Sequence, residues 1–395
     1  IEDLKNSFLG RLSVIHVLEA DAQEIELFTG LVSEEKCAEL FSSGWVDVEN
    51  AEPSKAVIFG CSGPALTDDE RRFFEESLPA GFILFERNCQ DPDQVRGLVG
   101  ELRETINRPD APVLIDQEGG RVQRLKPPHW RNAPPPGAFA ALAGRSLSRA
   151  EEAVCLNGQL IAAELSGLGI TVNCAPVLDI PGPDAHAIIG DRAFGNDPEI
   201  VAALGKAAAV GHFQGGVIPV IKHIPGHGRA KADSHEELPV VDAGAKELTE
   251  TDFSPFRALN RLPWAMTAHV VYTALDGDNP ATTSSEVISR TIRRDIGFQG
   301  VLVSDDIGMK ALGGPFEERA AAVLAAGCDL VLHCSGDTAE MEAVAAGAGP
   351  ITDKGLARLQ NGAAMLNTPG DIGGDIDAAA VQARLDEVMN AEGGA

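Results

Sequence analysis

The sequence predicts an α/β fold, a (β/α)8 TIM-type barrel that forms a single domain with a short N-terminal extension. From residue 56 onward, short apolar runs rich in β-branched residues alternate with longer segments of helical period, which is typical of βα units around a parallel sheet. Eight such runs occur, and eight strands close a barrel of this type. An open doubly wound sheet is the alternative that the same alternation permits.

The eight apolar runs are the predicted strands. Strands of a parallel sheet are buried on both faces, so they form nearly continuous apolar runs. They cover residues 56–63, 81–88, 112–120, 170–179, 217–226, 264–272, 300–308 and 328–336. The segments between them are predicted helices, and several carry terminal signals. Thr67 and Asp91, which precedes Pro92, are expected N-caps, and Gly297 is expected to follow the end of a helix.

The predicted barrel occupies residues 53–366, which leaves a segment at each end of the chain. Residues 1–52 contain strand-like and helix-like stretches but have no place in the strand count, so we expect an N-terminal extension to which no role is assigned. This segment lacks a glycine-rich phosphate loop and is too short for a nucleotide-binding domain, so no cofactor is expected. Residues 367–395 are predicted to be a glycine-rich linker and a C-terminal tail with a short amphipathic helix.

Charge and composition exclude several classes of function. With 32 basic and 59 acidic side chains the formal net charge is −27, which repels nucleic acid and anionic membrane surfaces, so neither is an expected partner. No apolar run reaches the length of a membrane-spanning helix, and the charged first residues lack the apolar core of a signal peptide. The seven cysteines are scattered without a CxxC pair, which argues against a disulfide framework or a zinc knuckle. We therefore expect a cytoplasmic monomer.

Polar residues end five of the predicted strands. In (β/α)8 barrels the functional groups lie at the C-terminal ends of the strands. The polar residues at these positions are Asp116, Glu118, Asp179, Lys222, His223, His269, Asp305 and Asp306. One histidine at a strand end is more often structural than catalytic, but many charged groups at one barrel mouth must pair with one another or bind a ligand. The glycines at 119, 120, 226 and 228 are expected in tight turns that need a positive φ.

Five motifs in order carry a family resemblance. They are DQEGGRVQRL (116–125), GDRAFG (190–195), KHIPGHG with DSHEELP (222–228 and 233–239), TAHVVY (267–272) and VSDDIGM (303–309). In order and spacing they resemble glycoside hydrolase family 3, and more narrowly its single-domain bacterial β-N-acetylglucosaminidases (β-N-acetylhexosaminidases) of peptidoglycan recycling. The resemblance covers residues 55–366 and implies a (β/α)8 barrel with retaining glycosidase activity.

The resemblance implies the catalytic residues. The family's nucleophile corresponds to Asp305, and a carboxylate at the end of the seventh strand can attack an anomeric carbon to form a glycosyl-enzyme. The acid/base corresponds to His235, with Asp233 as its partner. Side chains two residues apart on an extended chain lie on the same side, so Asp233 can bind one ring nitrogen of His235 and favour its protonated form. Asp306 is expected to point to the other side of the strand and to be structural.

The resemblance also implies how a sugar is held. Asp116, Arg124, Arg192, Lys222 and His223 match family positions that bind the hydroxyl groups of a non-reducing-end sugar, and donors combined with acceptors suit a polyol. A position on the cavity wall is expected for His269, and a loop-structuring role for His227. No metal is expected. The implied activity is an exo-acting release of N-acetylglucosamine from GlcNAc-β-1,4-anhydroMurNAc-peptides, a small-molecule substrate.

Three alternatives stay open at this point. A β-N-acetylglucosaminide phosphorylase of the same family uses the same Asp–His pair but passes the sugar to phosphate. A metal-dependent amidohydrolase-type barrel also uses His, Lys and Asp at its mouth, although no HxH pair ends the first strand and the histidines at 223, 227 and 235 lie close together on one loop. A non-catalytic sugar-binding protein is disfavoured because Asp305 and His235 are both present.

Overall fold

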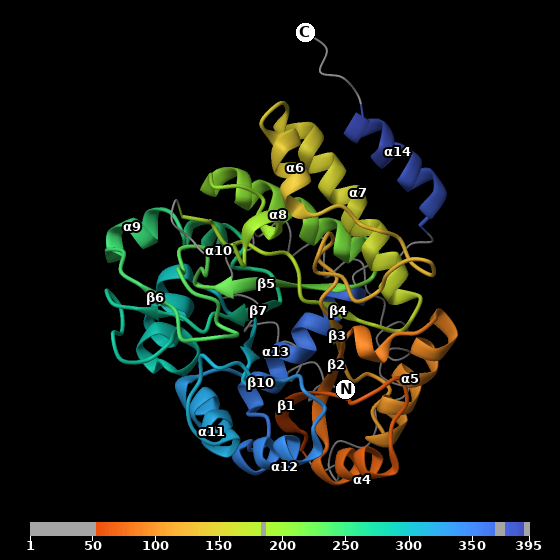
Figure 1. Ribbon diagram of the computed structural model, residues 1–395, viewed down its shortest axis with the longest axis vertical. Coiled ribbons are helices and arrows are strands. Elements are labelled where there is room, and N and C mark those ends of the chain that lie inside the picture. Colours follow the sequence, from red (N-terminus) through yellow and green to blue (C-terminus); the bar gives the residue numbers. More distant parts are fainter. Residues whose placement is uncertain (1–52, 183–186, 368–375, 391–395) are drawn as a thin grey trace, which may run out of the picture. The chain divides into compact units, whose positions relative to one another are not determined.

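The computed structural model describes residues 53–182, 187–367 and 376–390, so the predicted extension at 1–52 lies outside the described residues. Eight parallel strands form a closed barrel in the order β1-β10-β9-β7-β5-β4-β3-β2, and helices surround it (Figure 1). The predicted fold class and all eight predicted strands are confirmed, and the open sheet is excluded.

The barrel strands are shorter than most of the predicted runs. Their bounds are β1 Lys55–Gly60, β2 Pro79–Leu84, β3 Val113–Ile115, β4 Val172–Asn173, β5 Ile218–Ile224, β7 Trp264–Thr267, β9 Val301–Asp306 and β10 Leu330–His333. The apolar residues that follow several strands belong to buried loops at the mouth of the barrel, where apolar character continues after the ladder ends. Two further strands, β6 (Val240–Val241) and β8 (Val271–Tyr272), form a separate parallel pair in the loops after β5 and β7.

Helices connect the strands. The α-helices are α4 Asp68–Ser77, α5 Pro92–Thr105, α6 Pro136–Ala143, α7 Leu147–Ser166, α8 Pro198–Gln214, α9 Ala245–Glu250, α10 Ser254–Ala258, α11 Phe316–Ala326, α12 Thr338–Gly347, α13 Asp353–Ala364 and α14 Ala378–Asn390. The 3-10 segments are η2 Glu86–Asn88, η3 Gly190–Arg192, η4 Ala281–Thr283 and η6 Met365–Asn367, and η5 Val287–Ile296 is a π-helix.

The predicted helix ends are confirmed by their hydrogen bonds. Thr67 caps α4 in a capping box with Glu70, and the Asp91 side chain accepts hydrogen bonds from the first backbone N–H groups of α5. Gly297 follows η5 with a φ of 82°, a left-handed conformation that glycine adopts at little cost. Local sequence signals therefore fix where these helices begin and end.

Alternate residues of each strand face two different apolar cores. In β1, Ile58 belongs to the cluster that fills the inside of the barrel, whereas Val57 and Phe59 belong to the cluster between strands and helices. The inner cluster includes Trp264 and Met266 from β7. Apolar side chains thus fill the barrel below its mouth.

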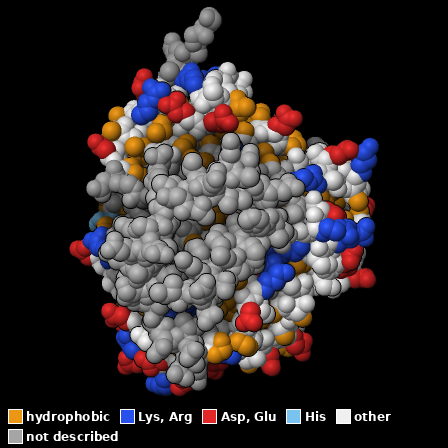
Figure 2. Space-filling model, turned by 180° about the vertical axis from the view of Figure 1, so that it is seen from behind, with side chains coloured by type: hydrophobic (Ala, Val, Ile, Leu, Met, Phe, Trp, Pro, Cys, Tyr) orange, Lys and Arg blue, Asp and Glu red, His pale blue; other side chains and the backbone are white. Residues whose placement is uncertain are grey.

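Two further features concern the surface. Helix α14 packs against α7 (Figure 1), where its Leu385 and Val388 are buried and Arg384 forms an ion pair with Glu152 at 2.7 Å. Figure 2 shows acidic and basic side chains interspersed along the edge of the molecule. Among the described residues, no helix has both the length and the apolar character that crossing a membrane requires.

Candidate active site

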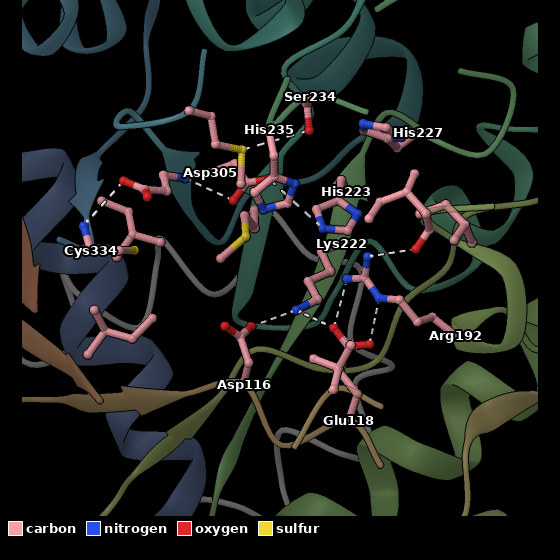
Figure 3. Close-up of a pocket in the computed structure, with 18 of the residues that line it drawn as sticks. Asp116, Glu118, Arg192, Lys222, His223, His227, Ser234, His235, Asp305 and Cys334 are labelled. Atoms are coloured by element: carbon pink, nitrogen blue, oxygen red, sulfur yellow. Dashed lines mark hydrogen bonds and ion pairs between the residues drawn. The ribbon is translucent and has the colours of Figure 1, made fainter. Parts of the chain in front are cut away.

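A cavity of about 260 Å³ opens at the C-terminal ends of the barrel strands, where the sequence predicts the site (Figure 3). Seven of the nine predicted site residues line it: Asp116, Arg124, Arg192, Lys222, His223, His235 and Asp305. Asp233 contacts the cavity through His235. Segments that are distant in sequence therefore meet at one polar cavity, as the barrel topology requires.

Five charged residues form an ion-pair network on one side of the cavity: Asp116, Glu118, Arg124, Arg192 and Lys222. The Lys222 ammonium donates to Asp116 at 2.8 Å and to Glu118 at 2.7 Å (Figure 3). Arg192 binds Glu118 through two nitrogens, at 2.8 and 2.9 Å, and Arg124 binds Asp116 at 3.0 Å. Every charge in the network has a partner of opposite sign, which offsets the large cost of burying it.

The network keeps its members charged. Burial raises the pKa of both carboxyl groups, but the neighbouring cations outweigh it, so the pKa of Glu118 falls to about 2 and that of Asp116 falls well below its ordinary value. Burial lowers the pKa of Lys222, but the two carboxylates raise it above its ordinary value. The network therefore presents fixed donors and acceptors to a ligand across the neutral pH range.

Glu118 is central to this network although it is not among the predicted site residues. Its side chain is 1% exposed and contacts both Lys222 and Arg192. The sequence feature that could have identified Glu118 is its spacing from Asp116, since side chains two residues apart on an extended segment point to the same side. That spacing would have placed both carboxylates in the cavity.

Asp305 lies near the end of β9 and is buried. One carboxylate oxygen accepts a hydrogen bond from the Asp306 backbone N–H at 2.8 Å, and the other lies 4.0 Å from Nε2 of His223. Burial raises the pKa of Asp305, but His223, His269, the Asp306 backbone N–H and Lys222 together lower it below its ordinary value. Asp305 is therefore an ionised carboxylate facing the cavity at neutral pH.

Lys222 and His223 lie just before Ile224, the last residue of β5, and both side chains line the cavity. The His223 Nδ1 binds Asp179 at 2.7 Å, and the Asp179 carboxylate also accepts the backbone N–H groups of His223 and His227. Because Nδ1 is bound to a carboxylate, its hydrogen is fixed there and Nε2 faces Asp305. Asp179 thus orients His223 from outside the cavity.

Asp233 and His235 lie on the loop after β5. The Asp233 carboxylate binds Nδ1 of His235 at 2.7 Å and accepts its backbone N–H at 2.9 Å. Between them, Ser234 accepts a backbone hydrogen bond from Ala311 at 3.2 Å, which ties this loop to the segment after β9. Nε2 of His235 is left for another partner, and the His235 side chain is 58% exposed.

The glycines in the loops after β3 and β5 differ in their roles. Gly119, Gly120 and Gly226 have positive φ values, as predicted. Gly228 does not, so the prediction is wrong for this position. A Cβ at Gly228 would lie 2.1 Å from the carbonyl oxygen of Ile180, so close packing requires glycine there.

Two strand-end residues have their side-chain polar atoms bound within the protein; Asp306 still lines the cavity, whereas His269 does not. His269 is fully buried, and its ring binds Thr282 at 2.8 Å and the carbonyl oxygen of Asp306 at 3.0 Å, so the structure does not bring it to the cavity wall. Both its nitrogens have protein partners, which sequence could not show. The Asp306 carboxylate accepts the backbone N–H groups of Gly308 and Cys334, a structural arrangement.

The described residues contain no group of three or more His, Cys, Asp or Glu side chains arranged to hold a metal ion. The histidines of the segment 222–235 have separate surroundings, with His223 bound to Asp179 and His235 bound to Asp233. Within the described part of the chain, six cysteines are free thiols.

The family model for the glycosyl hydrolase family 3 N terminal domain matches residues 33–357. This chain belongs to glycosyl hydrolase family 3. The family 3 match begins inside the segment predicted as an N-terminal extension, and the domain boundary at residue 53 stays a prediction.

Relatives of this family 3 protein are named β-hexosaminidases. The β-hexosaminidase of Alkalilimnicola ehrlichii is 40% identical over 313 residues, which cover 77% of this chain and 88% of the relative. That of Methylococcus capsulatus is 41% identical over 283 residues, covering 70% and 82%. NagZ from Neisseria gonorrhoeae, solved with N-trifluoroacetyl-D-glucosamine, matches with a TM-score of 0.75 and 33% identity over 86% of this chain and 99% of its own. The predicted family is confirmed, and the protein is a β-hexosaminidase-like glycoside hydrolase.

Proposed function

We propose that this family 3 enzyme is a retaining exo-β-N-acetylglucosaminidase that works through a glycosyl-aspartate intermediate. The observation that carries the proposal is that one cavity is lined by an ionised, buried carboxylate, Asp305, and by an imidazole oriented by a carboxylate, His235 with Asp233. These two groups are what a two-step displacement needs, since one attacks the sugar and the other handles the proton.

In the first step Asp305 forms a bond to the anomeric carbon while the glycosidic bond breaks. His235 gives its Nε2 proton to the leaving oxygen, so the leaving group departs as a neutral alcohol. In the second step the neutral imidazole takes a proton from water, whose oxygen attacks the anomeric carbon and restores the Asp305 carboxylate. Two displacements at one carbon return the β configuration, hence the retaining outcome.

The ion-pair network is proposed to hold the sugar at its non-reducing end. Asp116 offers acceptors, while Arg124, Arg192 and Lys222 offer donors, the combination that hydroxyl groups need, and Nε2 of His223 faces the same cavity. The cavity volume of about 260 Å³ is below the range of about 300–1,000 Å³ that is usual for larger ligands, so it suits one sugar residue. A cavity for one residue supports an exo mode of action.

The proposed natural substrate is a peptidoglycan fragment, GlcNAc-β-1,4-anhydroMurNAc-peptide, hydrolysed in the cytoplasm by a monomer. The sequence resemblance supports this choice, and so does the amino-sugar analogue found in NagZ from Neisseria gonorrhoeae. Only one Tyr and three Trp occur in 395 residues, which leaves little aromatic surface for a long polysaccharide. Mass spectrometry of a digest of purified muropeptides tests the substrate, and unchanged muropeptides would contradict it.

Phosphorolysis by the same residues is the second candidate, because an Asp–His pair can serve phosphate as well as water. The two reactions differ in their product. Hydrolysis in phosphate buffer gives free N-acetylglucosamine, whereas phosphorolysis gives its 1-phosphate. We expect the free sugar, and a phosphate-dependent rate with a sugar phosphate as the main product would reverse this choice.

The decisive experiment compares Asp305→Ala and His235→Ala on two substrates. Asp305→Ala is expected to lose turnover on both, because no covalent step remains. His235→Ala is expected to lose about 10²–10⁴-fold on a disaccharide but much less on an aryl glycoside, whose leaving group needs little protonation. His129, an exposed histidine outside the cavity lining, supplies the matched control His129→Ala, which should keep the wild-type rate. Near-normal turnover of Asp305→Ala would overturn the nucleophile assignment.

A further inference from the structure

Gln117 lies between two network residues but faces the opposite way. Its neighbours Asp116 and Glu118 line the cavity, whereas Gln117 is buried at 1% exposure. Its side-chain oxygen accepts the backbone N–H groups of Arg124 and Leu125 at 2.9 and 3.1 Å, and its amide donates to the Leu125 carbonyl at 2.9 Å. Gln117 thus links the backbone that carries two carboxylates to the backbone that carries Arg124.

The backbone of Gln117 is itself held by one side chain from the next strand. Asn173, the last residue of β4, accepts the Gln117 N–H with Oδ1 at 2.9 Å and donates Nδ2 to the Gln117 carbonyl at 2.9 Å. These two side-chain hydrogen bonds take the place of the backbone hydrogen bonds between β3 and β4, which end before Gln117. The direction of the Asn173 amide therefore decides whether Gln117 is held, since a flipped amide would oppose donor to donor and acceptor to acceptor.

His212 of α8 determines that direction. Its Nδ1 lies 2.7 Å from the Ala208 carbonyl oxygen, which can only accept, so Nδ1 carries the hydrogen. Burial lowers the pKa of His212 to about 4, so the ring is neutral at pH 7 and Nε2 is an acceptor. The Asn173 Nδ2 lies 2.8 Å from this Nε2. Only the amide orientation that also serves Gln117 gives Nε2 a hydrogen.

We propose that His212 and Asn173 are positioning residues for the sugar site: the fixed tautomer of His212 orients the Asn173 amide, which holds Gln117 and, through it, Asp116, Glu118 and Arg124. The relay runs from the outer helix α8 through β4 to the end of β3. His212 does not line the active-site cavity, so it acts only through its neighbours. The inference rests on the proposed sugar-holding role of Asp116 and Arg124.

The test compares two substitutions of His212 that differ in whether the new side chain can accept a hydrogen bond from Asn173. His212→Gln places an amide oxygen near the position of Nε2, so it can still accept from Asn173, whereas His212→Leu cannot. With a chromogenic β-N-acetylglucosaminide, His212→Leu is expected to raise KM about tenfold or more, since displacement of binding groups by a fraction of an ångström has effects of this size or larger. His212→Gln should stay within about twofold to threefold of wild type. Calorimetric binding of N-acetylglucosamine should follow the same order.

Equal KM and affinity in the two His212 variants would overturn the relay. If His212→Leu does not fold, Asn173→Asp provides the comparison, because its carboxylate cannot donate to both Gln117 and His212. Asn260→Asp is the matched control: Asn260 precedes β7 at the other end of the barrel, donates to the Ile296 carbonyl at 3.0 Å, and should leave KM unchanged. Asp116→Ala separates the two levels, since unchanged sugar affinity there would refute the proposed sugar site itself, whatever the His212 variants do.

Discussion

At the scale of single residues, the main feature is a lysine ammonium buried between two carboxylates. Lys222 is 2% exposed and lies within 2.8 Å of both Asp116 and Glu118. Together, such buried ion pairs contribute little to the free energy of unfolding, because the cost of removing the charges from water nearly equals their mutual attraction. Removing one partner is different, since it leaves an uncompensated charge in the interior.

Replacement of Lys222 by methionine should therefore destabilise the protein strongly. Loss of one partner from a buried pair costs about 3–5 kcal/mol. The control is Lys126→Met, because Lys126 also binds a carboxylate, Glu86 at 2.7 Å, but on the surface, where a pair contributes about 1 kcal/mol or less. Urea unfolding of both variants at pH 7.5 gives the two free energies. Similar losses would show that the network is not a buried unit.

At the scale of elements, the loop after β5 connects the proposed sugar-holding residues to the proposed acid/base. Lys222 and His223 lie near the end of the strand, and Asp233 and His235 follow on the loop. Gly228 lies between these pairs and packs against the backbone of Ile180. The position of the acid/base therefore depends on a close backbone contact as well as on the flexibility of glycine.

Gly228→Ala should lower kcat, because a Cβ would lie 2.1 Å from the Ile180 carbonyl oxygen and the loop would have to move. A shift of about 1 Å in a catalytic group can cost about 10²-fold in rate. The control is Gly244→Ala, because Gly244 follows the same loop in sequence but an added Cβ there meets no atom within 4 Å. Steady-state kinetics of both variants make the comparison. Equal kcat values would mean that the Gly228 contact does not set the loop position.

At the scale of the whole molecule, buried ionisable groups determine the response to acid. Burial lowers the pKa of both His212 and His227 to about 4, against about 6.5 in an unfolded chain. Between these values the unfolded chain binds protons that the folded protein does not, so stability falls as pH falls from about 6.5 to 4. For Asp179 burial raises the pKa, but His223 lowers it to about 2, so its contribution is present above about pH 4 and is lost below it.

Urea unfolding from pH 7.5 to pH 4 should therefore show a continuous loss of stability that begins below about pH 6.5. Each of the two histidines contributes up to about 3 kcal/mol over this range. His212→Gln removes one contribution, so its curve should be flatter than that of the wild type between pH 6.5 and 4. Parallel curves would show that His212 does not resist protonation in the folded state.

Sequence was sufficient for the fold because the signals it uses are local. Apolar runs mark the eight strands, and the caps at Thr67 and Asp91 mark helix starts whose hydrogen bonds the structure shows. Strand bounds were less accurate. For example, the ladder of β4 ends at Asn173, whose side chain takes over the bonds to Gln117. That replacement depends on a residue of a neighbouring strand, which a linear pattern does not contain.

The site was predicted mostly through its motifs, and its remaining parts depend on three-dimensional partners. Glu118 could have been added from its spacing with Asp116. The burial of His269 away from the cavity could not have been predicted from sequence, because it depends on hydrogen bonds to Thr282 and to the backbone of Asp306. The relay through His212 was likewise invisible in sequence, since it joins three elements by hydrogen bonds.

The ion-pair network is not electrically neutral by itself. Its three cations, Arg124, Arg192 and Lys222, face two carboxylates, and Asp305 supplies the third negative charge. In the proposed intermediate Asp305 is an uncharged ester, so Lys222 loses the attraction of this carboxylate where charges are poorly screened. The electrostatics of the site therefore disfavour the covalent intermediate and favour its breakdown, because release of the sugar restores the Asp305 carboxylate. The enzyme would in this way avoid becoming trapped halfway through its own reaction.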